Sequence, residues 1–192
     1  EEDDHLTVFS IRNVGMSRMD LSPMTHLIAL TVISAGLSDI TLPESPELFE
    51  MNLEGNNFSD IDLTMYPRLS YLGLTDNQLT TFDASKYPNL GLLAIGRNQL
   101  SEIRLDNPQL WSLDLAGNNL KEVDLTRLPE LYQCGLSENR LSNLDLSGNT
   151  GLRILFLDHN RFTFATLPLP SAFQLYTYAG QEALNPNFGN GI

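Results

Sequence analysis

The stretch LWSLDLAGNNL, residues 110–120, reads L-x-x-L-x-L-x-x-N-x-L, and the same pattern returns along the chain. Its asparagine slot is filled six times in succession, by Asn56, Asn77, Asn98, Asn118, Asn139 and Asn160. The step between neighbouring asparagines is constant except between Asn98 and Asn118, where it is one position shorter. Two further steps of the same size toward the N-terminus reach Ala35 and Val14, which stand among suitably spaced apolar residues. We therefore expect eight repeats, of which the first two lack the asparagine.

The L-x-L core of each repeat predicts a short strand. Successive side chains of a strand point to opposite faces, so both apolar residues of L-x-L point inward. The inward pairs are Met51/Leu53, Leu72/Leu74, Leu93/Ile95, Leu113/Leu115, Cys134/Leu136 and Leu155/Leu157. Each repeat would stack as a parallel strand on the next. The inward asparagine can offer two donors and an acceptor to the bend that follows, so we expect the six asparagines to form a structural ladder.

The second half of the repeat is a further short alternating segment, as in Ile61-Asp62-Leu63 and Val123-Asp124-Leu125. This pattern favours extended chain or short β-structure over helix. A proline then reopens five repeats, which suits a corner because proline fixes φ and lacks an N–H; these residues are Pro46, Pro67, Pro88, Pro108 and Pro129.

A fixed period of about 20–29 residues with this spacing is typical of leucine-rich repeats. The pattern P-x-L-x-x-L-x-L-x-x-N-x-L-x-x-L-D-L resembles a bacterial class with a 21-residue unit, found in surface and secreted proteins of Bacteroidetes and distantly related to the internalins. The resemblance covers residues 6–167 and implies a right-handed, mainly β solenoid with a parallel sheet on its concave side. The chain departs from the pattern at Val14, Ala35, Arg104 and Thr150.

The changing regularity divides the chain into five parts. We expect a disordered charged tail at 1–5, two degenerate capping turns at 6–45, the regular array at 46–160, a C-terminal cap at 161–180 and a linker or tail at 181–192. Within the cap, residues 173–179 have the composition of one more short strand.

Composition limits the partners. The formal net charge of −13 and the pI near 4.4 argue against nucleic acid, which needs a basic surface. We expect no membrane insertion, because no apolar run approaches the length that a membrane span needs. The single cysteine, Cys134, falls in an inward slot and should be buried. We expect a monomer, and the resemblance implies an extracellular or cell-surface location.

Nothing in the sequence favours an enzyme or a bound cofactor. The three histidines, His5, His26 and His159, are dispersed, and no nucleophile, phosphate or metal motif is present. A parallel β-helix enzyme that acts on polysaccharide has a similar period. The N-x-L signal, and a turn made of one strand and one extended return segment, favour the leucine-rich repeat instead. The aspartates Asp62, Asp83, Asp124 and Asp145 recur at one repeat position. We expect solvated or turn-bonded carboxylates there rather than a calcium site.

The concave sheet is the expected binding surface of such a solenoid. Between its inward residues, Gly73, Ala94 and Gly135 suggest a bare strip on which a partner could approach the backbone. The expected partner-binding residues on or beside that strip are Tyr71, Leu92, Trp111, Asp114, Tyr132, Ile154 and Phe156. The predicted function is adhesin-like binding of a partner protein. A glycan-binding module and a structural spacer that presents another domain remain as alternatives.

Overall fold

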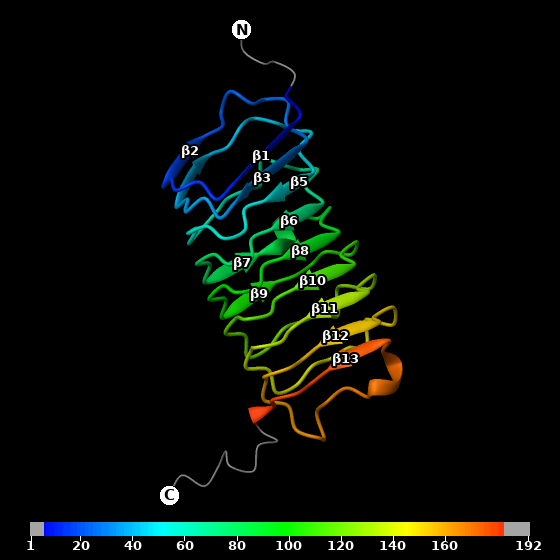
Figure 1. Cartoon of the computed structure of the whole chain (residues 1–192). Coiled ribbons are helices and arrows are strands. Elements are labelled where there is room, and N and C mark those ends of the chain that lie inside the picture. The colour runs from blue at the N-terminus through cyan, green and yellow to red at the C-terminus, as the bar shows by residue number, and fades with distance from the viewer. Residues whose placement is uncertain (1–5, 183–192) are drawn as a thin grey trace, which may run out of the picture.

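The computed structural model describes residues 6–182 and shows a β-solenoid whose strands form one long parallel sheet. The sheet holds nine strands in chain order, and its first and last strands lie at opposite ends of the stack (Figure 1). These strands are β1 (Val8–Arg12), β3 (Ala29–Ile33), β5 (Glu50–Asn52), β6 (Tyr71–Gly73), β8 (Leu92–Ala94), β10 (Ser112–Asp114), β11 (Gln133–Gly135), β12 (Ile154–Phe156) and β13 (Leu175–Thr177). The predicted leucine-rich-repeat architecture is therefore confirmed, with β13 added at residues 173–179. The predicted tail at 1–5, and residues 183–192 of the predicted linker, lie outside the described residues.

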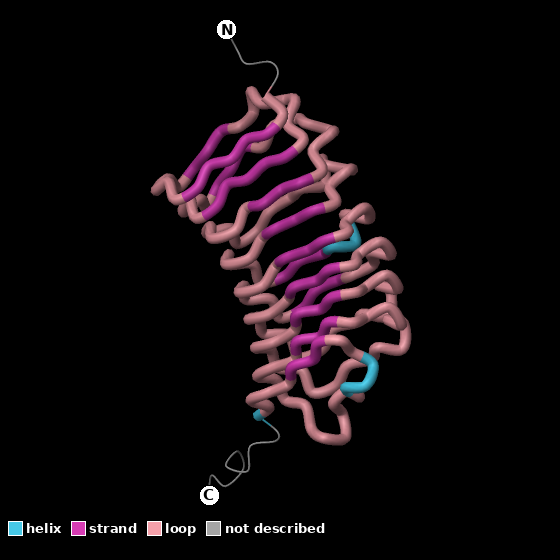
Figure 2. Tube along the Cα trace, turned by 45° about the vertical axis from the view of Figure 1, so that its right-hand side comes forward, coloured by secondary structure: helices cyan, strands magenta, loops and turns pink. Residues whose placement is uncertain are grey.

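The return half of each turn is extended chain with short strands, as expected. Two small parallel sheets form there, one from β2 (Arg18–Asp20) and β4 (Asp39–Thr41), the other from β7 (Thr81–Asp83) and β9 (Glu102–Arg104). Helix within residues 6–182 is limited mainly to the 3₁₀ turns η1 (Ala84–Lys86) and η2 (Pro170–Ala172), which stand out in Figure 2.

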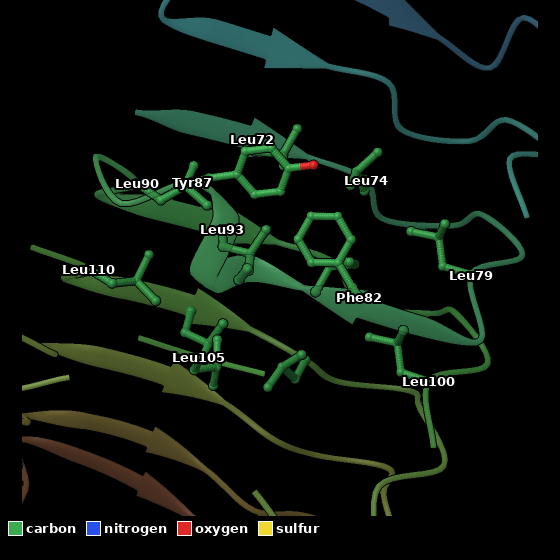
Figure 3. Close-up of a cluster of buried hydrophobic side chains, with 14 of the residues drawn as sticks. Leu72, Leu74, Leu79, Phe82, Tyr87, Leu90, Leu93, Leu100, Leu105 and Leu110 are labelled. Atoms are coloured by element: carbon green, nitrogen blue, oxygen red, sulfur yellow. The ribbon is translucent and has the colours of Figure 1, made fainter. Parts of the chain in front are cut away.

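The register places equivalent residues of successive repeats side by side. Met51 pairs with Leu72, Leu72 with Leu93, and Leu93 with Leu113, so the inward slots form continuous apolar rows. Those four side chains are at most 1% exposed. Figure 3 shows how leucines from both halves of the turn meet around Phe82 and Tyr87. Burying each such side chain stabilises the fold by roughly 1.5–3 kcal/mol, and every turn depends on its neighbours for that burial.

The slot asparagines join each turn to the one before it. The Nδ2 group of Asn77 donates to the carbonyl oxygens of Leu53 (3.0 Å) and Leu74 (3.1 Å), which belong to the preceding turn and to its own. Its Oδ1 accepts the N–H of Phe58 at 3.0 Å. The six asparagines are between 0% and 7% exposed. They satisfy backbone groups at a buried bend, which would otherwise be costly to bury.

The ladder has a seventh rung, Gln181, which lies one further repeat step after Asn160. Its Nε2 group donates to the Leu157 oxygen at 2.7 Å, and its Oε1 accepts the N–H of Phe162 at 3.0 Å. Gln181 is 4% exposed. Gln181 falls in the predicted linker or tail, because the asparagine that marks the other rungs is absent there. A glutamine side chain carries the same amide one methylene further out and makes the same bonds.

The residue before each rung, and before the equivalent Val14 and Ala35, adopts a left-handed backbone conformation. The nine residues at this position have φ between 49° and 69°: Asn13, Ser34, Gly55, Asp76, Arg97, Gly117, Glu138, His159 and Gly180. Glycine tolerates this region without steric cost, whereas a Cβ does not. Six of the nine residues are therefore strained, which shows that the surrounding turn imposes the bend.

A second polar position lies just before the corner proline. The Tyr66 hydroxyl donates to the Pro43 oxygen at 2.7 Å, and burial raises the pKa of that phenol to about 12. Asn107, which is 0% exposed, belongs to the repeat that is one position shorter. Its Nδ2 group donates to the oxygens of Ala84 (3.0 Å) and Tyr87 (2.9 Å) in the preceding turn. This position is not recognisable in the sequence, because serine, tyrosine, asparagine and leucine occupy it in different repeats.

Candidate binding surface

The concave face, meaning the solvent side of the long sheet, carries five of the seven predicted binding residues. Tyr71 and Leu92 are register partners on adjacent strands β6 and β8. Ile154 and Phe156 lie together on β12, further along the sheet. All four are partly buried. The structure therefore forms two apolar patches, which the strands β10 and β11 separate, rather than one continuous strip.

The expected bare strip is not present at Gly73 and Gly135. A Cβ at Gly73 would lie 2.9 Å from Asn52 Oδ1, and a Cβ at Gly135 would lie 2.8 Å from Asp114 Oδ1. Both glycines are buried. The longer side chains of the preceding strands thus lean over these glycines, and the expectation that a partner reaches bare backbone there was wrong. The small residues make room for neighbours rather than for a ligand.

Asp114 and Asn52 are held in these positions by their own turns. Asp114 Oδ1 accepts the N–H of Ala116 at 3.0 Å, and Asn52 Oδ1 accepts the N–H of Glu54 at 3.0 Å. Side chains of this type commonly bond the backbone two residues on. One carboxylate oxygen of Asp114 is occupied in this way, and the residue remains partly exposed on the concave face.

Trp111 and Tyr132 belong to a row of exposed aromatic residues beside the sheet. Each stands immediately before its strand, as does Phe49, and the three side chains are 49%, 42% and 43% exposed. We call these three residues the aromatic ridge. A Cβ at Gly91 would meet the Trp111 indole nitrogen at 3.2 Å, so the indole lies across Gly91 of the preceding turn.

The ridge is anchored by backbone bonds between turns and by one side-chain bond. The N–H of Tyr132 donates to the Trp111 oxygen at 2.9 Å. The Tyr132 hydroxyl donates to Gln174 Oε1 at 3.2 Å, across the intervening turn. Phe49 was missed by the sequence analysis, although its place directly before the Glu50–Asn52 strand was the signal that identified Trp111 and Tyr132.

Acidic groups surround Tyr71. Glu50 is its register partner on β5. Burial raises the pKa of the Tyr71 phenol, and the negative charges of Glu50 and Glu54 raise it further. This part of the face therefore has a negative potential, in keeping with the net charge of −13, and it would attract cationic groups.

The recurring aspartates act as turn caps. Asp62 Oδ1 accepts the N–H and the hydroxyl of Thr64 at 2.9 and 2.7 Å, and Asp124 does the same with Thr126 at 2.9 and 2.6 Å. These bonds lower the pKa of both carboxyl groups. The turn-bonded role that the sequence analysis favoured is thus the one observed. Within residues 6–182, no group of three or more His, Cys, Asp or Glu side chains is placed to hold a metal ion.

Cys134 lies in its predicted inward slot, with 0% of its surface exposed, and burial raises the pKa of its thiol strongly. It is therefore a core residue rather than a nucleophile. His159 is exposed in one of the left-handed turns. Among residues 6–182 there is no helix long and apolar enough to cross a membrane.

Comparison with known proteins identifies the fold. No protein-family model matches the chain, and no curated protein matches it by sequence. Several solved structures do match the chain. The functional domain of InlJ from Listeria monocytogenes is 22% identical with a TM-score of 0.73, over 94% of this chain and 45% of that one. Internalin C2 from the same organism is 20% identical with a TM-score of 0.76, over 90% and 80%.

A third similar structure is an octameric complex of latrophilin 3, Unc5D and the leucine-rich repeat of FLRT2. It is 16% identical with a TM-score of 0.67, over 93% of this chain and 69% of that one. The chain spans less than half the length of the InlJ domain. Identities at this level show the fold alone: the chain has a leucine-rich-repeat solenoid fold, similar to the folds of these internalins.

Proposed function

We propose that the chain is a non-catalytic protein-interaction module of a bacterial surface or secreted protein, and that it acts in an adhesin-like way. The observation that carries this proposal is the aromatic ridge. Phe49, Trp111 and Tyr132 expose large apolar surfaces at one repeat position beside the sheet. Trp111 and Tyr132 lie on adjacent turns, and the turns of Ser70 and Gly91 separate them from Phe49. Exposed aromatic side chains are costly in solution and are enriched at the centres of protein interfaces.

The partner contacts in this proposal are the ridge and the two apolar patches of the concave face. Tyr71 with Leu92 would form the first contact, Ile154 with Phe156 the second, and Trp111 would lie between them. Structural likeness supports a binding role by analogy, because one similar structure is a protein complex that includes a leucine-rich repeat.

The charge distribution supports a basic partner surface. Glu50 and Glu54 stand next to Tyr71, and the chain as a whole is acidic. A lysine or arginine of the partner could pair with these carboxylates while its cation lies over the Tyr71 ring, an arrangement favoured by the charge distribution of aromatic rings. Binding of this kind should weaken as the salt concentration rises.

A glycan is the second candidate ligand, and the half-exposed Trp111 favours it. The indole edge lies against Gly91, and about half of the Trp111 surface is exposed, so that the ring can stack on a sugar ring. A sugar bound in this way would depend on Trp111 far more than on the acidic residues, so its affinity would change little with salt.

The test is a pull-down from host-cell surface extract and from mucin. It compares the wild type with the Trp111→Ala/Tyr132→Ala double variant and with Phe164→Ala, which removes an equally apolar side chain that is 83% exposed elsewhere. A protein retained by wild type and Phe164→Ala but lost with the double variant would support the proposal. Mucin glycan retained in that pattern would favour the second candidate.

Circular dichroism would show whether all three proteins are folded, and the exposed positions make that the expected result. Capture that is equal for the wild type and the double variant would refute a role for the ridge. No capture by any of the folded proteins would leave the structural spacer as the better description.

A further inference from the structure

The C-terminal end of the array contains a hollow of about 380 Å³ that none of the seven predicted binding residues lines. It lies between the return segment at residues 144–149 and the loop that leads to η2. Its walls are mainly apolar and include Leu146, Leu169 and Phe173. This volume falls within the range of roughly 300–1,000 Å³ typical of small-ligand sites.

The hollow exists because the repeat changes after β12. Leu63 and Leu125 occupy the repeat position of Leu146, and both are fully buried, because the next turn packs over them. After Leu146 the next return segment forms a separate turn, in which the N–H of Thr163 donates to the Thr166 hydroxyl at 3.0 Å. Figure 2 shows this segment and η2 turning away from the stack. Leu146 is left partly exposed.

One of the residues that line this hollow, Asn149, has a buried polar atom without a partner. Asn149 is 5% exposed, and its Nδ2 group donates to the oxygens of Leu125 (2.9 Å) and Leu128 (2.8 Å). Its Oδ1 has no hydrogen-bond partner among the described residues. At the same repeat position, Asn107 Oδ1 accepts the N–H of Asp106 at 3.1 Å. Asn149 Oδ1 is thus a fixed acceptor that lacks a donor of the kind that Asn107 Oδ1 has. Buried acceptors without a donor are rare in proteins.

Two further groups of the wall are held in place. The Nη1 of Arg153 donates to the oxygens of Thr150 (3.0 Å) and Leu152 (2.9 Å), which fixes the guanidinium at the rim. The Phe173 ring stacks on Tyr176, with ring centroids 5.1 Å apart. A fixed guanidinium plane and a fixed aromatic ring both favour contact with another aromatic ring.

We propose that this hollow binds an aromatic ring that carries an N–H or O–H donor, an indole or a phenol. The donor bonds to Asn149 Oδ1, and the ring lies against Phe173 and the Arg153 guanidinium. A free small molecule presents this chemistry, and so does a tryptophan or tyrosine side chain of a partner. The site is independent of the proposed function of the concave face.

The first experiment titrates the isotope-labelled chain with indole and follows its NMR spectrum. We expect saturable shifts at residues around the hollow, including the side-chain amide of Asn149. Benzothiophene has nearly the same shape but no N–H, so it leaves the buried oxygen unpaired and should bind roughly fivefold or more weakly. Equal affinities for the two compounds, or shifts that do not saturate with indole, would overturn the proposal.

Two exposed positions provide a matched pair of variants. Leu169 lines the hollow and is 77% exposed, whereas Phe164 lies in the same loop, is 83% exposed and does not line it. Leu169→Asp should weaken indole binding at least roughly fivefold by placing a charge at the apolar wall, while Phe164→Asp should leave it unchanged. Equal binding by both variants would contradict the assignment.

A third titration, with the peptide Gly-Gly-Trp-Gly-Gly, separates the two sources of the ligand. Binding of the peptide with the same shifts as indole supports a partner's side chain as the occupant. Binding of indole without the peptide supports a free aromatic molecule.

Discussion

Replacing Asn98 by alanine tests the ladder directly, because its side chain makes four hydrogen bonds. Its Nδ2 group donates to the oxygens of Leu74 (2.9 Å), Ile95 (3.1 Å) and Gly96 (3.1 Å). Its Oδ1 accepts the N–H of Leu79 at 3.0 Å. Asn98 is 7% exposed, so water cannot readily replace these bonds.

The cost of Asn98→Ala can be worked from these partners. The Leu74 oxygen keeps a second donor in Asn77, and the Ile95 oxygen keeps one in Asn118, so each lost bond there costs only about 0.5–1.5 kcal/mol. The Leu79 N–H is left without its acceptor in a buried site, which costs about 1–3 kcal/mol. Together these terms predict a loss of about 4 kcal/mol in the free energy of unfolding, and a fall in Tm of roughly 8–16 °C.

The assays are urea unfolding and amide hydrogen exchange, with Gln99→Ala as the control. Gln99 is the exposed neighbour, so its truncation should change stability by no more than about 0.5 kcal/mol. The Leu79 amide should lose protection in Asn98→Ala and keep it in Gln99→Ala. Equal unfolding midpoints for the two variants would refute the reasoning that the amide bonds hold the turns together.

Three further predictions follow from single residues. Glu138→Gly should stabilise the chain by about 0.5–1 kcal/mol, and Gly117→Ala should destabilise it by about 1 kcal/mol, because both positions have a left-handed φ; thermal unfolding measures both. The hydrogen bond from the Thr126 hydroxyl, and to a smaller extent the one from the Thr126 N–H, lower the pKa of Asp124 below its ordinary value of 3.8. These bonds therefore stabilise the folded state above that pH, and the stabilisation is lost as the pH falls through the lowered pKa. The difference in Tm between wild type and Asp124→Asn should therefore be largest at neutral pH and shrink below about pH 4; a constant difference would exclude the carboxylate as its source. The buried Cys134 thiol should resist Ellman's reagent in buffer and react in concentrated urea, and rapid reaction in buffer would contradict its place in the core.

The period and the inward positions could be predicted from the sequence because they depend on local physics. Alternation in a strand places Leu113 and Leu115 on one side whatever surrounds them, and a short, nearly constant repeat step allows only stacked turns. The same reasoning identified Asn98 as an inward ladder residue and Cys134 as a core residue. It also identified Trp111 and Tyr132 as lying beside the sheet.

Side chains that meet across turns could not be read in this way. The space over Gly73 and Gly135 depends on the orientation of the Asn52 and Asp114 side chains. A hydrogen bond to the backbone of its own turn fixes each of these two side chains. The unpaired oxygen of Asn149 depends on where the chain goes in the following turn. Periodicity determines which residues become neighbours, because it acts through backbone geometry that every repeat shares. The rotamer of each neighbour, and the space left where the repeat ends, follow from packing between particular side chains, and only the tertiary structure decides that packing.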